Sequence, residues 1–188
     1  MRDNRQIRSF ATTFRAEETE NDRYIEGYFS TFSGVYVIAP GVEESVEPTA
    51  FDGALDDDIR ALIDHETRLV LGRTIAGTLE LSVDDKGLWG RIRINSDDTD
   101  AMNLYARVKR GDVSQCSFGF DILDEDREMR PDGTVHYTIK SVKLYEVSVV
   151  TFPAYRDTAV EARAADIKAT KQRQLEAWRE TQKARLKH

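Results

Sequence analysis

The chain contains a single cysteine, Cys116, among its 188 residues, so it cannot form an internal disulfide. This scarcity fits a reducing compartment. We expect the thiol to act as a small core side chain, and a nucleophilic cysteine is the alternative. There is also no apolar run of membrane length and no secretory signal pattern. We therefore expect a soluble, cytosolic protein.

Ligands for metals and cofactors are equally scarce. Three scattered histidines and one cysteine do not provide the spacing of a metal site. Glycine-rich phosphate loops and dinucleotide fingerprints are missing as well. The net charge of −7 argues against non-specific nucleic-acid binding. We expect no metal, no cofactor, no nucleic-acid partner and no membrane partner.

The residues that are present favour one globular domain followed by a tail. Hydrophobic residues make up 40% of the chain and charged residues 32%, which suits a core with a heavily solvated surface. Alternation and β-branched residues predict a β-rich domain. The acidic segment Asp97-Asp-Thr-Asp100 is expected to cap a helix that runs to about Arg110 and that Gly111 stops. The strands are expected at 7–14, 24–32, 59–65, 70–74, 75–83, 88–94, 113–122, 135–144 and 146–151, with loops or turns at 33–48, 66–68 and 124–133.

The segment 113–122 carries the first candidate for chemistry. Strand alternation places Cys116, Phe118, Phe120 and Ile122 on a core face. The other face carries Ser117 beside Gly119, and the glycine would let another backbone come close. A serine in a strand is usually only a tolerated small residue. Its importance depends on what the rest of the chain brings near it.

Two further segments supply a histidine and an acid. His65 ends the apolar run 60–65, and Glu146 stands in the middle of a strongly strand-forming segment, 143–153. A serine, a histidine and an acid on three strands are the parts of an activated-nucleophile site. Their chain order differs from that of the chymotrypsin, subtilisin and hydrolase folds. An edge-strand glutamate that faces water is the alternative for Glu146.

Six short motifs follow one another over roughly residues 23–156. They are Glu47-Pro-Thr-Ala-Phe51, Asp64-His-Glu66, Leu71-Gly-Arg73, Asp85-Lys-Gly-Leu88, Ser117-Phe-Gly-Phe120 and Glu146-Val-Ser-Val-Val-Thr-Phe-Pro153. This ordered set resembles the prohead maturation proteases of tailed bacteriophages, serine proteases similar to the herpesvirus assembly protease. Glu66 stands where aspartate often follows the histidine in that family, and Thr49 where glycine is expected.

The resemblance implies roles for the three candidates. Ser117 is expected to be the nucleophile, His65 the general base and Glu146 the acid that orients the imidazole. His136 is the alternative third member, because the herpesvirus enzymes use a second histidine there, whereas His188 is not a candidate. The rival nucleophiles are Ser114 and Ser148. For the oxyanion donors, the backbone around Gly119 and the segment 71–73 are the two guesses.

We therefore predict an α+β, β-rich domain, a partly closed antiparallel barrel with flanking helices and a long C-terminal helix. The protease domain is expected at 1–156, with its core at about 23–156. A charged helical tail is expected at 157–188, with nine Lys and Arg against five Asp and Glu from Arg156 onward. Ile167, Leu175, Trp178 and Leu186 form its weak apolar side. The tail is a solvated helix end, an arm that binds scaffold or capsid, or a segment that is later removed.

The resemblance further implies an endopeptidase that acts inside the immature phage capsid in the host cytoplasm. Its expected substrates are scaffold segments or extensions of the major capsid protein, and itself, with an oligomer as an open question. The alternative is a non-enzymatic structural or scaffolding module of phage assembly with the same fold.

Overall fold

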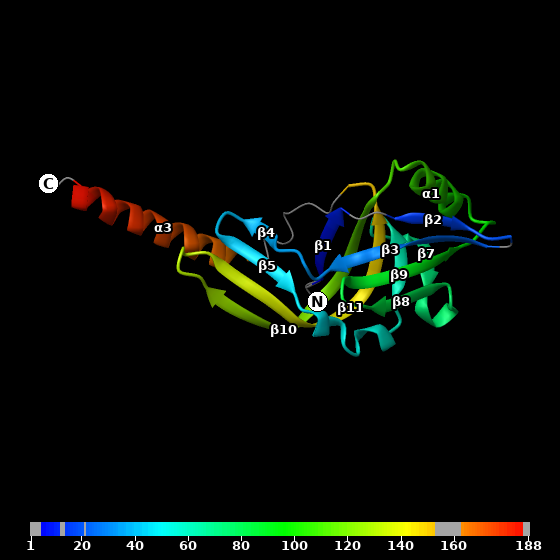
Figure 1. The fold of residues 1–188 in the computed structure, drawn as a ribbon, viewed down its shortest axis with the longest axis horizontal. Coiled ribbons are helices and arrows are strands. Elements are labelled where there is room, and N and C mark those ends of the chain that lie inside the picture. Colours follow the sequence, from blue (N-terminus) through cyan, green and yellow to red (C-terminus); the bar gives the residue numbers. More distant parts are fainter. Residues whose placement is uncertain (1–4, 12–13, 21, 153–162, 186–188) are drawn as a thin grey trace.

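The computed structural model describes residues 5–11, 14–20, 22–152 and 163–185, and most of them lie in two β-sheets (Figure 1). The larger sheet has the order β1-β10-β11-β5-β4, and β6 and β7 extend it beside β11. The smaller sheet has the order β2-β3-β9-β8. The larger sheet comprises β1 (Gln6–Ala11), β4 (Tyr36–Ala39), β5 (Val42–Val46), β6 (Arg60–Ile63), β7 (Glu66–Arg73), β10 (Gln115–Met129) and β11 (Val135–Val150). The smaller comprises β2 (Arg15–Glu18), β3 (Arg23–Thr31), β8 (Leu79–Val83) and β9 (Gly87–Ile94).

A long antiparallel hairpin of β10 and β11 connects the two ends of the molecule. Along its first part β11 pairs in parallel with β5, and along its last part it pairs in parallel with β6. The outer edge of β10 is covered by β1. One end of this hairpin therefore belongs to the main core, while the other end lies beside β4, β5 and the C-terminal helix.

The main core lies between the two sheets. β-Branched and aromatic residues fill it because alternate positions of each strand point to the same face. Phe118 contacts Phe51 edge-on and stacks on Phe120, so the face predicted for 113–122 is confirmed, and Cys116 is fully buried with it. The smaller sheet contributes Ile25, Phe29, Leu88 and Ile92, and the larger sheet adds Ala61, Leu144, Val147 and Val149.

Helix α1 (Thr99–Arg110) begins and ends as its sequence predicts. The Asp98 side chain accepts hydrogen bonds from two backbone amides of the first turn. Gly111 ends the helix with φ 88°, a left-handed conformation that glycine adopts at low cost. Short 3-10 helices lie at Pro48–Phe51, Ala54–Asp56 and Thr74–Ala76.

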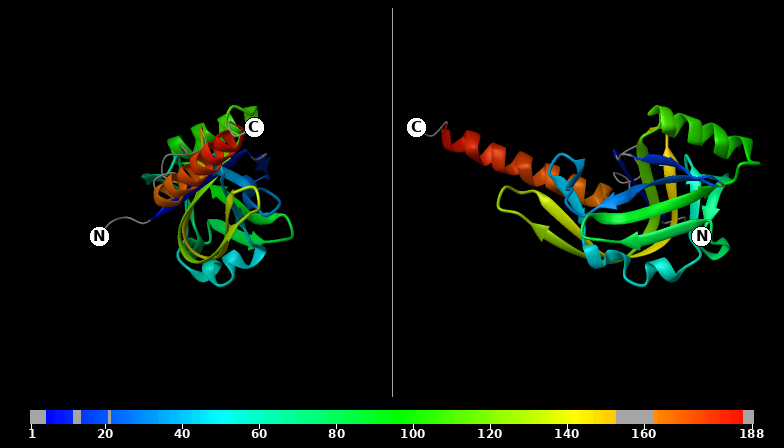
Figure 2. Two further views of the ribbon diagram at one scale, coloured as in Figure 1. Left: turned by 90° about the vertical axis from the view of Figure 1, so that its left-hand side faces the viewer. Right: turned by 45° about the vertical axis from the view of Figure 1, so that its right-hand side comes forward.

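Helix α3 (Ala164–Arg185) confirms the predicted C-terminal helix over its described part. It leaves the body beside β4 and β5 and extends away from both sheets (Figure 2). Only its start is anchored, because Ile167 packs in a small cluster with Ile38, Val42, Val135 and Tyr137. Leu175 and Trp178 are exposed, so this side of the described helix is not covered. Leu186 lies outside the described residues, as does the predicted domain boundary at 156/157.

Several predicted loops are strands. The expected loop at 33–48 contains β4 and β5, which Pro40 and Gly41 connect as a tight turn. The expected turn at 124–133 is largely strand, because β10 continues to Met129 in register with β11. Charged residues on both faces hide this hairpin from an alternation argument, and its cross-strand pairing decides the structure. The α+β, β-rich class is confirmed. Both described sheets have open ends, so the barrel is not confirmed.

Candidate active site

Ser117 lies in β10 on the face that looks away from the main core. Its nearest neighbours across the sheet are Ser9 of β1 and Ser148 of β11, each directly opposite in the strand register. The residue is fully buried. Its hydroxyl donates a hydrogen bond to the Arg8 carbonyl at 2.9 Å and accepts one from the Ser9 hydroxyl at 2.9 Å. Both bonds of this hydroxyl therefore go to β1.

Glu146 lies in β11 opposite Gly119, on the same face as Ser117 and Ser148. Its side chain is only 3% exposed. One carboxylate oxygen contacts His65 Nδ1 at 2.7 Å, and the other accepts a hydrogen bond from the Ser148 hydroxyl at 2.6 Å. A buried carboxylate is costly unless it is paired, and here both oxygens have partners. The acid thus has a designated contact, in contrast to a glutamate facing water.

The sequence predicted that His65 lies on a strand. The structure instead places it in the two-residue turn between β6 and β7. Asp64 and His65 have φ values of 47° and 62°, the pattern of a type I′ hairpin turn. Residues other than glycine adopt this left-handed backbone conformation at a cost of about 1 kcal/mol or more each. The Asp64 carboxylate accepts hydrogen bonds from the backbone and side chain of Thr151, just beyond β11. These bonds tie the turn to the strand that carries Glu146.

The contact with Glu146 also bears on the tautomer of the imidazole. A carboxylate accepts hydrogen bonds, so in the neutral imidazole this contact favours the tautomer with the proton on Nδ1, which leaves the lone pair on Nε2. Nε2 is buried and has no hydrogen-bond partner among the described residues. This nitrogen is the atom that would accept a proton from a nucleophile.

Gly119 provides the room for the acid. A Cβ atom at this position would lie 2.4 Å from the Glu146 carboxylate oxygen that contacts His65. Such a distance is far below normal contact, so any other residue would push the carboxylate aside. The sequence predicted the close approach of another backbone to this glycine, but the group that approaches is the side-chain carboxylate of Glu146.

Comparison with known proteins places the chain in a family. The family model described as caudovirus prohead serine protease matches residues 10–173, well over half of the chain. The chain belongs to this family. The predicted resemblance is thereby confirmed.

Two prohead proteases are similar in sequence. That of Enterobacteria phage HK97 is 28% identical over 141 residues, which cover 73% of this chain and 60% of the relative. That of Escherichia phage T5 is 31% identical over 97 residues, or 52% of this chain and 42% of the relative. The chain thus spans less than two thirds of either relative.

A solved structure shares the fold. The capsid assembly protease of bacteriophage T4 superposes with a TM-score of 0.53 at 12% identity, covering 80% of this chain and 98% of that one. At this identity the similarity concerns the fold alone.

The alternative third member and the rival nucleophiles have other positions or other contacts than Ser117, His65 and Glu146. His136 precedes Glu146 by ten positions in β11, roughly 33 Å along an extended strand. It contacts Ser45 and Arg130 instead of His65. Ser114 is exposed and precedes β10, and His188 lies outside the described residues. Ser148 is close to the site, but its hydroxyl donates to Glu146.

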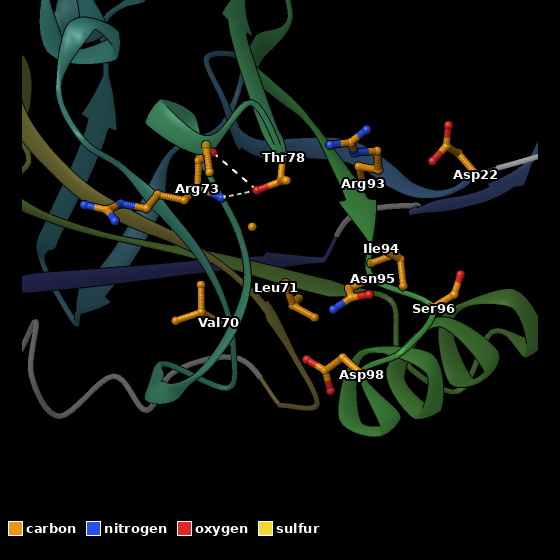
Figure 3. Close-up of a pocket in the computed structure, with 12 residues that line it drawn as sticks. Asp22, Val70, Leu71, Arg73, Thr78, Arg93, Ile94, Asn95, Ser96 and Asp98 are labelled. Carbon is orange, nitrogen blue, oxygen red and sulfur yellow. Dashed lines mark hydrogen bonds between the residues drawn. The ribbon is translucent and has the colours of Figure 1, made fainter.

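The segment Leu71-Gly-Arg73 also lies away from Ser117. It belongs to β7, which β6 and β11 separate from β10 in the sheet. Three strand spacings amount to roughly 14 Å, so its backbone is not a candidate for the oxyanion donors. The segment lines a pocket of about 520 Å³ beside β9 and the start of α1 (Figure 3). Ser117, His65 and Glu146 do not line this pocket.

Among the described helices, none combines the length and the apolar character needed to cross a membrane.

Proposed function

We propose that this chain is a serine endopeptidase of phage capsid maturation. Its substrates are scaffold segments or extensions of the major capsid protein, and copies of itself, inside the procapsid in the host. Family membership supports a peptidase, and the names of the HK97 and T5 relatives support the prohead as its place of action. The observation that carries the proposal is the contact of His65 with Glu146 on the face of the sheet where Ser117 lies.

In the proposed reaction, Ser117 Oγ attacks the carbonyl carbon of the scissile peptide. Its proton moves to His65 Nε2, which becomes an imidazolium that Glu146 stabilises through Nδ1. The peptide C–N bond then breaks, the proton passes to the leaving amine, and an acyl-enzyme remains. A water molecule attacks this ester with His65 again as base, and it releases the new carboxylate and restores the Ser117 hydroxyl.

Ser117 must turn for this reaction, because its hydroxyl now donates to β1. A rotation about χ1 between staggered positions is sufficient to redirect a serine hydroxyl. Ser148 has a supporting role, since its hydrogen bond holds the second oxygen of Glu146.

A fluorophosphonate probe tests the proposal on the folded chain. Prolonged incubation should label one serine, and peptide mapping should identify it as Ser117. The Ser117→Ala variant is the control and should remain unlabelled. Labelling at a different serine would contradict the assignment, and no labelling of any serine would favour a non-enzymatic structural module of phage assembly.

The Glu146→Gln variant should lose about 10²- to 10⁴-fold in turnover. The amide keeps the shape of the side chain but can present a donor to His65, which favours the wrong tautomer. His136→Ala is the matched control, and it should change turnover by less than about tenfold because His136 contacts Ser45 and Arg130 instead. Turnover of both variants is compared at equal folded fraction. If Glu146→Gln stays active while His136→Ala loses its activity, His136 is the third member and the site is Ser-His-His.

The Gly119→Ala variant should lose about 100-fold in turnover while it remains folded. The new methyl group would displace the Glu146 carboxylate from His65, and a shift of about 1 Å at a catalytic group has an effect of this size. Adding Glu146→Asp, which shortens the acid by one methylene, should recover part of the loss by making room for the methyl group. Unchanged turnover in Gly119→Ala would show that the position of the carboxylate does not matter.

A further inference from the structure

The two sheets face each other across a gap that one residue bridges. Thr78 precedes β8, and its backbone N–H donates to the Arg73 carbonyl of β7 at 3.2 Å. Its own carbonyl accepts from the Arg93 N–H of β9 at 2.9 Å, and its hydroxyl accepts from the Arg73 N–H at 2.9 Å. A Cβ atom at Gly72 would lie 2.7 Å from the Thr78 carbonyl oxygen, so glycine permits this close approach. Thr78 thus acts as a single residue of a strand between β7 and β9.

Beyond this bridge both strand edges are unpaired. Among the described strands β7 pairs only with β6, and β8 follows β9 only as far as Ile92. The pocket of about 520 Å³, called here the β7–β9 pocket, opens at this place, with Val70 and Leu71 on one side and Ile94 and Asn95 on the other (Figure 3). Unpaired edges bind an extended peptide as an added strand, because their main-chain groups still lack partners.

The lining of the β7–β9 pocket favours an uncharged side chain. Arg73 is engaged with Asp58 through two hydrogen bonds, and the Asp98 carboxylate caps helix α1. Arg93 and Asp22 carry opposite charges, so together they select neither sign. The remaining residues of the wall are uncharged. An apolar side chain on an extended peptide therefore suits this pocket.

Val70 lies in the same row of the larger sheet as the proposed nucleophile. Ser117 lies opposite Ser148 of β11, which lies opposite Leu62 of β6. Leu62 in turn lies opposite Val70 of β7, which is 42% exposed. Directly opposite residues share a face of a sheet, so Val70 belongs to the face of Ser117. Three strand spacings separate the two residues, roughly 14 Å, which an extended chain covers with about four residues.

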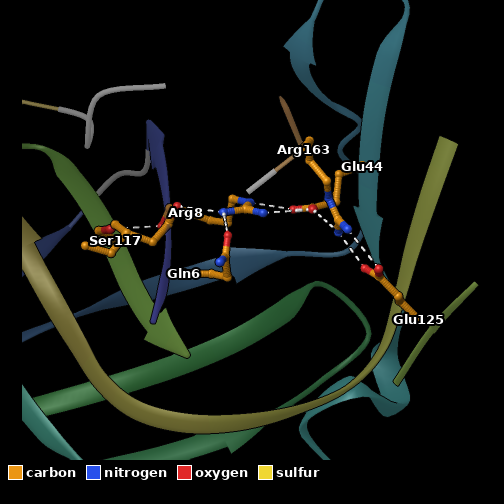
Figure 4. Close-up of polar contacts among 7 residues, drawn as sticks. Gln6, Arg8, Glu44, Ser117, Glu125 and Arg163 are labelled. Atoms are coloured by element: carbon orange, nitrogen blue, oxygen red, sulfur yellow. Dashed lines mark hydrogen bonds and ion pairs between the residues drawn. The ribbon is translucent and has the colours of Figure 1, made fainter. Parts of the chain in front are cut away.

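The chemistry of the base indicates which part of a substrate comes to this edge. In the proposed reaction His65 gives its proton to the leaving amine, so the residues after the cleaved bond lie on the His65 side of Ser117. His65 belongs to the turn that leads into β7. On the other side of Ser117 the sheet continues with β1, where the Arg8 carbonyl accepts from the Ser117 hydroxyl and Glu44 binds the Arg8 side chain (Figure 4). The edge of β7 is therefore within reach of the residues that follow the cleaved bond.

We propose that the β7–β9 pocket is a second binding site for the substrate. It holds the fourth to sixth residues after the cleaved bond as an extended strand, with a valine, leucine or isoleucine against Val70. This inference rests on the proposed function and adds a determinant of substrate choice. Because the pocket lies away from the reacting atoms, its contacts are equally strong in the ground state and in the transition state. Their loss should raise KM and leave kcat unchanged.

The experiment uses the full chain and a pool of host-cell peptides prepared with an unrelated protease. Mass spectrometry reads the cleaved bonds. We expect valine, leucine or isoleucine to be enriched at least about threefold at one position from the fourth to the sixth after the bond. A well-cleaved peptide is then synthesised in full and in a version that ends, as an amide, after the third residue. This truncation should raise KM about tenfold, the range for the loss of one apolar contact.

The Val70→Asp variant tests the pocket itself. It should raise KM for the full peptide about tenfold and change KM for the short peptide less than about twofold, because both changes remove the same contact. Val37→Asp is the matched control and should change neither KM, since Val37 is an exposed valine of the edge strand β4 that does not line the pocket. Fluorophosphonate labelling of Ser117 should have one rate in all three chains, because this probe does not extend to the pocket. If Val70→Asp does not fold, Val70→Thr replaces it, with an expected rise in KM of about threefold.

Other outcomes contradict the proposal. Absence of enrichment from the fourth to the sixth position, or enrichment only before the bond, would show that the substrate does not use the pocket. Equal losses on both peptides, or slower labelling in Val70→Asp, would mean that Val70 acts on the reacting groups instead. Labelling of Ser117 without cleavage of any peptide would also count against the pocket, since the pool offers apolar residues at every position. A chain that labels at no serine and cleaves nothing would instead overturn the proposed function.

Discussion

Replacing Ser117 with alanine should abolish proteolysis, with a loss in turnover on the order of 10⁶-fold. The change removes only the hydroxyl that would attack the peptide carbonyl. Two hydrogen bonds to β1 disappear with it, which costs about 1 kcal/mol in the free energy of unfolding. The variant should therefore fold and keep its sheets. Turnover on peptides and the mass of the protein after prolonged expression are the measurements, beside those of the unaltered chain.

The control for this prediction is Ser114→Ala. Ser114 is exposed and precedes β10, so its replacement should leave turnover and mass unchanged. Retained cleavage in Ser117→Ala, with loss in Ser114→Ala, would mean that the nucleophile is the other serine.

Replacing His65 with alanine should lower turnover by about 10⁴- to 10⁶-fold, because the base and its nucleophile act as a unit. Combined with Ser117→Ala, it should add little further loss. Independent, additive losses would show that the two residues do not work together. The measurement is turnover of the single and double variants at matched folded fraction.

A glycine at the same position separates catalysis from folding. His65 has φ 62°, which glycine adopts without strain. The free energy of unfolding should therefore be higher for His65→Gly than for His65→Ala. Its turnover should nevertheless be as low as that of His65→Ala. Recovery of activity together with stability would indicate that His65 serves the turn instead of the reaction.

The amino-acid pattern alone determined those features that depend on neighbouring residues. Alternation in 113–122 placed Cys116 and Phe118 in the core and Ser117 on the opposite face, because side chains of a strand alternate by geometry. The Asp98 cap and Gly111 likewise defined both ends of α1, since helix ends need local partners for their backbone groups. The family resemblance pointed to the three candidate residues, but not to the contact between His65 and Glu146.

Only the tertiary structure decided which segments lie side by side. The long hairpin of β10 and β11, the strands within 33–48 and the open sheets depend on pairing partners far apart in the chain, which local propensity does not specify. His65 reaches Glu146 from a strained turn that Thr151 holds, and Gly119 is required because a carboxylate from another strand occupies the place of its side chain. The position of β1 beside Ser117 also depends on residues far apart in the chain. The six-residue strand β1 pairs antiparallel with β10, and its Arg8 contacts a buried carboxylate on β5, a long-range contact that no local pattern encodes.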